Sequence, residues 1–146
     1  MIALACDHGG FELMKHVKAY LESGRHVYKD FGAFSPESCD YPVAAAEAAR
    51  AIADGVCDRG IFICGTGIGV SITANKIPGI RAALCTNIYM AEMARSHNDA
   101  NVLALGGRVI EAESAIGIVK TFLCTPFSSE KKHRRRVGML NDLDNR

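Results

Sequence analysis

The sequence predicts an α/β protein of three layers: a five-stranded parallel sheet, Rossmann-like with the flavodoxin-like strand order, and helices on both faces. Three observations support this. Short apolar runs alternate with amphipathic stretches along the chain, which is typical of a parallel sheet covered on both faces. The 146 residues, 49% of them apolar, suffice for one core. Neither a repeat nor a linker interrupts the pattern, so residues 1–146 are predicted to form a single domain.

The first half of the chain is expected to supply three strands and two helices. Residues 1–6 form an apolar run and are predicted as the first strand. Apolar side chains at helical spacing predict a helix over 11–21, which Ser23-Gly24 ends, and residues 26–31 follow as the second strand. After a loop, Pro42 suits the first position of an Ala-rich helix that ends near residue 54. Residues 60–64 form the third strand.

The second half repeats the alternation. A glycine-rich turn opens a helix that runs toward residue 76, where Pro78-Gly79 breaks it. The fourth and fifth strands are predicted at 81–85 and 102–105, with a helix at 88–96 between them. A helix over 111–123 ends before Pro126, and Ser128-Ser129 suits the cap of a basic C-terminal helix at about 129–143.

Charge and the N-terminus exclude several classes of protein. The 17 Lys and Arg nearly balance the 16 Asp and Glu, and a net charge of +1 is too small for broad binding to nucleic acid or to an anionic membrane. No basic leader precedes Asp7, so neither a signal peptide nor a membrane span is expected. The six cysteines form no CxxC pair, which favours the reducing cytoplasm and mostly buried thiols.

The predicted strand order, 2-1-3-4-5, places a switch point between the first and third strands, where ligands bind at the carboxyl ends. The first strand is followed there by Asp7-His8-Gly9-Gly10, and the third ends in Cys64-Gly65-Thr66-Gly67-Ile68-Gly69. Backbone N–H groups of such a glycine-rich turn can hold an anion, although glycine needed only for packing explains the turn equally well. Cys64 is the candidate base or nucleophile, because a helix N-terminus favours the reactive thiolate.

Histidines and cations complete the chemical signals. His97 lies in a polar cluster before the fifth strand, and imidazole suits proton transfer near neutral pH; a surface position without a role is the alternative. Lys132 and Arg136 share one helical face, which suits a phosphate group, with Arg108 as a third cation; a solvated face is the alternative. Metal-ligand spacings, nucleotide-binding motifs and a GxSxG elbow are all missing. The set therefore favours proton transfer on a small phosphorylated metabolite.

Five separate stretches carry a family resemblance. They are D-H-G-G-F at 7–11, D-Y-P at 40–42, I-C-G-T-G-I-G-V-S-I-T-A-N-K at 63–76, G-I-R-A at 79–82 and H-N-D-A-N-V-L-A-L-G at 97–106. In this order they resemble the ribose-5-phosphate isomerase B family, which also contains allose-6-phosphate and galactose-6-phosphate isomerases. The resemblance implies an isomerase of the pentose phosphate pathway that interconverts ribose 5-phosphate and ribulose 5-phosphate through a cis-enediolate, without metal or cofactor.

The resemblance also implies roles for the matched residues. Cys64 corresponds to the base that moves a proton between C1 and C2, and His97, assisted by Asp7, to the group that opens the furanose ring. The remaining correspondences are Gly65, Thr66, Gly67, Gly69 and Ser71 for the enediolate oxygens, Tyr41 and Asn98 for substrate contacts, and His8, Arg108, Lys132 and Arg136 for phosphate.

The sequence departs from the family's pattern at two places, and two alternative functions stay open. Lys132 stands where an arginine is usual, and residues 128–131 replace a glycine-rich approach. A hexose 6-phosphate, of allose or galactose, is the alternative substrate, and a non-catalytic sugar-phosphate-binding module is the alternative of another class. His97 is expected at the amino ends of the strands, away from Cys64. A homodimer or tetramer in which His97 of one chain completes the site of another is therefore predicted.

Overall fold

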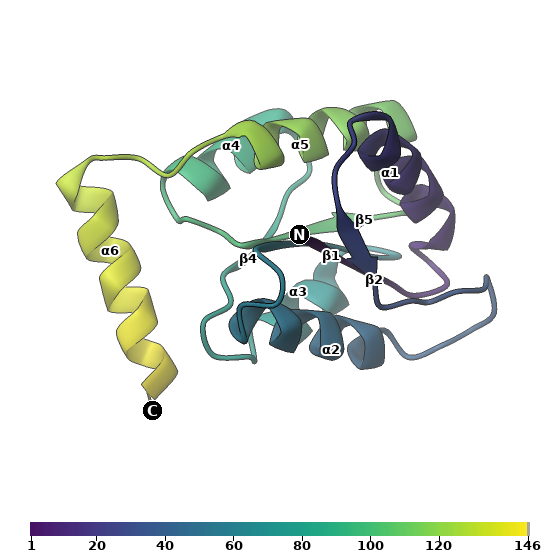
Figure 1. Cartoon of the computed structure of the whole chain (residues 1–146), viewed down its shortest axis with the longest axis horizontal. Helices are drawn as coiled ribbons and strands as arrows, with labels where there is room; N and C mark the ends of the chain where they lie inside the picture. The colour runs from purple at the N-terminus through teal and green to yellow at the C-terminus, as the bar shows by residue number, and fades with distance from the viewer. Residues whose placement is uncertain (146) are drawn as a thin grey trace.

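The computed structural model describes residues 1–145 and confirms the predicted class. Five parallel strands form one sheet, with helices on both faces (Figure 1). The strands are β1 (Ile2–Cys6), β2 (Tyr28–Asp30), β3 (Arg59–Cys64), β4 (Ala82–Leu84) and β5 (Val102–Gly106). The helices are α1 (Phe11–Ser23), α2 (Tyr41–Ala53), α3 (Ile68–Ala74), α4 (Ile88–Ser96), α5 (Ala112–Cys124) and α6 (Lys131–Asp142), and a 3₁₀ turn, η1 (Leu143–Asn145), follows.

The strand order is β2-β1-β3-β5-β4, so the predicted order of the last two strands is wrong. All five residues of β5 are buried, whereas the three residues of β4 are half-buried. Burial beside β3 stabilises the longer strand β5 more than it would stabilise β4, because β5 has more apolar surface to bury. The short strand β4 therefore lies at the edge of the sheet. The connection from β4 to β5 therefore runs back toward β3. A right-handed crossover in that direction places α4 on the opposite face from α3.

Two apolar cores lie on the two faces of the sheet. Helices α1, α4 and α5 cover one face, and α2 and α3 cover the other (Figure 1). Successive side chains of β5 divide between them: Leu103 and Leu105 pack in the first core, and Ala104 packs in the second. Burial on both faces explains why the strands read as continuous apolar runs.

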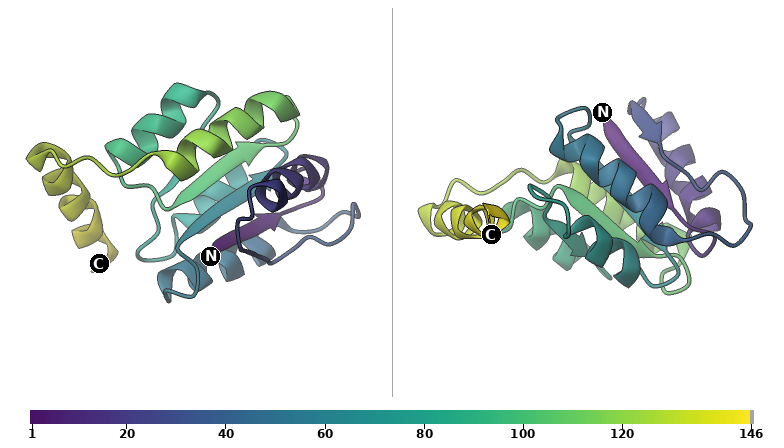
Figure 2. Two further views of the ribbon diagram at one scale, coloured as in Figure 1. Left: turned by 45° about the horizontal axis from the view of Figure 1, so that its top comes forward. Right: turned by 90° about the horizontal axis from the view of Figure 1, so that it is seen from below.

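Helix α6 lies beside this body, at the end of the connecting segment 125–130 (Figure 2). The η1 side chain Asp144 accepts a hydrogen bond from the N–H of Gly79 at 2.7 Å, and Arg81 donates from Nη1 to Oδ1 of Asn141 at 3.0 Å. Only two of the helix's side chains, His133 and Val137, are buried. Apolar side chains at the end of the chain therefore face solvent in the single chain: Met139, Leu140 and Leu143.

The described residues include no helix that is both long and apolar enough to cross a membrane.

Candidate active site

The carboxyl ends of β1, β3 and β5 meet at one edge of the sheet, hereafter the carboxyl edge. Backbone hydrogen bonds lock these ends together just beyond the strands. The N–H of Asp7 donates to the carbonyl of Ile63 at 3.2 Å, and the N–H of Arg108 donates to the carbonyl of Gly65 at 3.0 Å. The sequence therefore predicted correctly that the segments after the first and third strands lie together.

Cys64 is the last residue of β3, and its side chain is 4% exposed. Its Sγ accepts a hydrogen bond from the N–H of Gly67 at 3.2 Å, which fixes the sulfur against the turn. Gly67 has φ = +79°, and a Cβ there would lie 2.5 Å from Cδ1 of Leu84, so the turn requires glycine. The N–H of Gly67 is thus directed at the Cys64 sulfur, whereas the resemblance assigned Gly67 to the enediolate oxygens.

The N–H groups of the turn are the structure's candidate oxyanion donors. Within residues 1–145, those of Gly65, Thr66 and Gly69 have no protein acceptor. Helix α3 has only seven residues, shorter than the sequence predicts, so these individual N–H groups matter more than a helix dipole. Ser71, expected to help them, instead donates its hydroxyl to the carbonyl of Ile68 at 2.9 Å.

The other cysteines lack this setting. Burial raises the pKa of Cys6 and of Cys85 to about 11, so both thiols stay protonated near neutral pH and serve as apolar core. Cys57 is also buried, whereas Cys39 and Cys124 are exposed, which corrects in part the expectation of buried thiols.

Two polar side chains that follow β1 also lie at the carboxyl edge. The buried carboxylate of Asp7 accepts the N–H of Gly10 at 3.1 Å. His8 accepts the N–H of Cys39 on Nδ1 at 3.2 Å, which leaves its Nε2–H to donate to a ligand.

Two longer side chains lie against the glycine-rich turn. The Tyr41 ring packs so closely on Gly69 that a Cβ at position 69 would lie 2.7 Å from it, and Nη1 of the exposed Arg108 is 3.2 Å from where a Gly65 Cβ would be. The two glycines therefore give a tyrosine and an arginine access to the turn.

The remaining predicted residues lie at the opposite, amino edge of the sheet: His97, Asn98, Lys132 and Arg136. The loop 97–101 precedes β5 and Arg108 follows it, so a strand about 16 Å long separates the two groups. Lys132 forms an ion pair with Glu130 at 3.0 Å. His97 therefore lies at the edge opposite Cys64, as its position in a helix-to-strand loop predicted.

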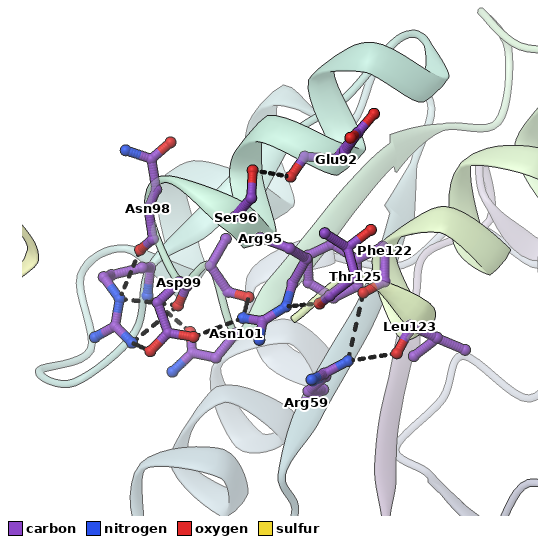
Figure 3. A network of polar contacts seen from close by, with 12 residues as sticks. Arg59, Glu92, Arg95, Ser96, Asn98, Asp99, Asn101, Phe122, Leu123 and Thr125 are labelled. Atoms are coloured by element: carbon purple, nitrogen blue, oxygen red, sulfur yellow. Dashed lines mark hydrogen bonds and ion pairs between the residues drawn. The ribbon is translucent and has the colours of Figure 1, made fainter. Parts of the chain in front are cut away.

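Two arginines clamp the loop 97–101 through Asp99 (Figure 3). Asp99 has φ = +45°; its Oδ2 lies 3.1 Å from Nη2 of Arg81 and its Oδ1 lies 2.9 Å from Nη1 of Arg95. Arg95 is buried and also donates to the carbonyl of Ala100 at 2.6 Å, and Arg81 donates to that of Asn98 at 3.2 Å. This clamp holds the part of the loop next to His97.

Replacing Asp99 with alanine is expected to lower the free energy of unfolding by about 3 kcal/mol, because the buried Arg95 would lose the carboxylate that balances its charge. Asp99→Asn should cost less, since asparagine tolerates positive φ and still accepts hydrogen bonds. Urea unfolding followed by circular dichroism measures both. A loss below about 1 kcal/mol in Asp99→Ala would show that the clamp is not stabilising.

His133 is a residue of the amino edge that sequence reasoning missed. Its ring stacks on that of His97, with 4.0 Å between the ring centroids and 10° between the ring planes. The sequence shows it only as one member of a basic run, and helical spacing within that run singles out Lys132 and Arg136 instead.

Comparison with known proteins agrees with this geometry. The sequence model described as "Ribose/Galactose Isomerase" matches residues 2–140. Ribose-5-phosphate isomerase B of Escherichia coli is 45% identical over 99% of this chain and 97% of its own length, and the Mycobacterium tuberculosis protein of the same name is 37% identical over 98% and 89%.

Solved structures give the same result. Ribose-5-phosphate isomerase B of Clostridium thermocellum superposes with a TM-score of 0.96 at 48% identity, covering 99% of this chain and 97% of that one. The Thermotoga maritima enzyme superposes with a TM-score of 0.93 at 49% identity and 97% coverage of both chains. The resemblance carried by the five sequence stretches is thereby confirmed, and the chain belongs to the ribose/galactose isomerase family.

Proposed function

We propose that this isomerase interconverts ribose 5-phosphate and ribulose 5-phosphate through a cis-enediolate, with Cys64 as the base. One observation carries the proposal: a buried sulfur lies at the carboxyl edge beside a turn whose N–H groups at Gly65, Thr66 and Gly69 lack acceptors within residues 1–145. Relatives named ribose-5-phosphate isomerase B support the choice of substrate.

Aldose–ketose isomerisation needs a base and hydrogen-bond donors close together. The base removes a proton from C2 of the open aldose and returns it to C1, while negative charge develops on the oxygens of C1 and C2. Fixed N–H groups stabilise that charge without reorganising. The Gly67 hydrogen bond holds the Cys64 sulfur in place for transfer between adjacent carbons.

Opening of the furanose ring would use residues from both edges of the sheet. The C1–O4 bond breaks, O4 gains a proton and the C1 hydroxyl loses one, steps we assign to His97 with assistance from Asp7. Because these residues lie at opposite edges of one sheet, we assign them to different copies of the chain in a homodimer, or in a tetramer built from such pairs. The solvent-facing apolar side chains of α6, Met139 and Leu140, support burial against a second copy.

The same pairing accounts for the phosphate. Arg108 and His8 lie on the carboxyl edge of one copy, and α6 of the partner would add Lys132 and Arg136, one helical turn apart. The mechanism requires no cofactor, and a cytoplasmic location remains a prediction.

Incubation of the pure protein with ribose 5-phosphate in the presence of EDTA tests the function. We expect ketose to form, and to form more slowly from allose 6-phosphate or galactose 6-phosphate, the second candidates that the family's description keeps open. Failure with all three sugars would contradict the isomerase proposal and favour a sugar-phosphate-binding module. A requirement for added metal would contradict the proposed mechanism.

A further inference from the structure

The two stacked imidazoles at the amino edge come from different elements. His97 caps the C-terminus of α4, and His133 lies in the first turn of α6. Their rings are nearly parallel, with centroids 4.0 Å apart, which is face-to-face contact. His97 is half-buried, whereas His133 is 4% exposed. The buried ring of His133 is therefore fixed by its surroundings, and the ring of His97 packs on it.

The charges around His133 favour a neutral ring. Burial, and next the neighbouring His97, lowers its pKa, with smaller contributions in the same direction from Lys132 and Arg136. Glu130 opposes them, and its Oε1 lies 4.0 Å from Nε2 of His133. Two imidazolium rings in face-to-face contact would repel each other.

We propose that His133 is a positioning residue for the ring-opening step: its buried, flat ring holds the imidazole of His97 in the orientation that exchanges protons with the sugar. This inference rests on the proposed function, in which His97 acts on the furanose. His133 touches His97 and not the substrate. The backbone side of the loop is held separately, by the clamp of Asp99 between Arg81 and Arg95.

Three substitutions separate stacking from space filling. His133→Ala removes the ring, His133→Leu fills the space without a flat face, and His133→Phe restores a flat uncharged ring. His26→Ala is the control for loss of a histidine elsewhere, because His26 is exposed and has no role in the proposed mechanism. Thermal unfolding shows whether each variant folds.

With ribose 5-phosphate, we expect His133→Ala and His133→Leu to lower kcat by about tenfold or more while KM changes little. A positioned acid or base usually contributes about 10²–10⁴-fold to the rate, and a misoriented His97 would lose part of that contribution. His133→Phe should stay within about threefold of the wild type, because it keeps the stack.

A second measurement isolates ring opening from the chemistry at Cys64. Ribulose 5-phosphate cannot close a furanose ring, because its O5 carries the phosphate. Incorporation of deuterium from D₂O into its C1 therefore reports enediolate formation without ring opening. His133→Ala and His133→Leu should keep this exchange within about threefold of the wild type while net conversion of ribose 5-phosphate falls.

Equal activity of His133→Leu and His133→Phe would overturn the inference, as would near-normal kcat in His133→Ala or parallel loss of exchange and conversion in all variants. Failure of the proposed function looks different: the wild type and His26→Ala would then also fail to convert ribose 5-phosphate.

Discussion

Cys64→Ala is expected to lower the turnover of ribose 5-phosphate by roughly 10²–10⁴-fold, the range that a positioned acid or base contributes. Alanine removes the sulfur, which is the only group of that side chain able to carry the proton between C1 and C2. The N–H groups of Gly65, Thr66 and Gly69 remain, so binding of a phosphorylated ligand should stay measurable. Steady-state kinetics and a ligand-binding titration measure the two effects separately.

Cys57 supplies the control for this substitution. It is buried to a similar extent, 2% exposed against 4% for Cys64, and packs in the same core. Cys57→Ala should therefore have a comparable cost in stability, while turnover stays within about twofold, as expected for a change away from reacting atoms. Near-normal turnover in Cys64→Ala, with Cys57→Ala also normal, would place the base elsewhere.

Mixing Cys64→Ala with His97→Ala protein is expected to restore activity that neither variant has alone. In a hybrid dimer, one site loses both residues and the other contains both. Random exchange of subunits makes about half of the dimers hybrids. Each hybrid has one intact site of two, so the mixture should reach about a quarter of the wild-type activity. Turnover of ribose 5-phosphate before and after exchange measures the recovery, and native mass spectrometry measures the hybrid fraction.

A mixture of Cys64→Ala with Cys64→Ser is the control, because its hybrids contain no intact Cys64 and should stay inactive. Absence of recovery in the first mixture, with hybrids present, would show that Cys64 and His97 act within one chain. It would contradict the shared site but not the isomerase reaction.

The sequence predicted which segments meet at the carboxyl edge because the patterns that mark strand ends are local. Apolar runs mark the ends of β1 and β3, and parallel strands bring those ends to one edge, so Asp7 and Cys64 could be expected together. It also indicated that His97 lies at the other edge, since a helix-to-strand loop precedes its strand. Each of these inferences needs only neighbouring residues and the geometry of a parallel sheet.

Other features depended on competition between distant segments. The apolar patterns of β4 and β5 are compatible with either order in the sheet, and the greater burial available to β5 decided between them. The N–H of Gly67 could not be assigned to the Cys64 sulfur from spacing, because its direction depends on the backbone torsions of the two residues between them.

By itself the sequence determined the fold class, the family and the identity of the groups able to move protons, because periodicity, glycine spacing and ordered motifs are properties of contiguous residues. Only the tertiary structure decided which of those groups meet. It clamped Asp99 between two arginines and stacked His133 on His97. These contacts join segments far apart in the chain, and packing of the whole molecule, rather than local pattern, selects them.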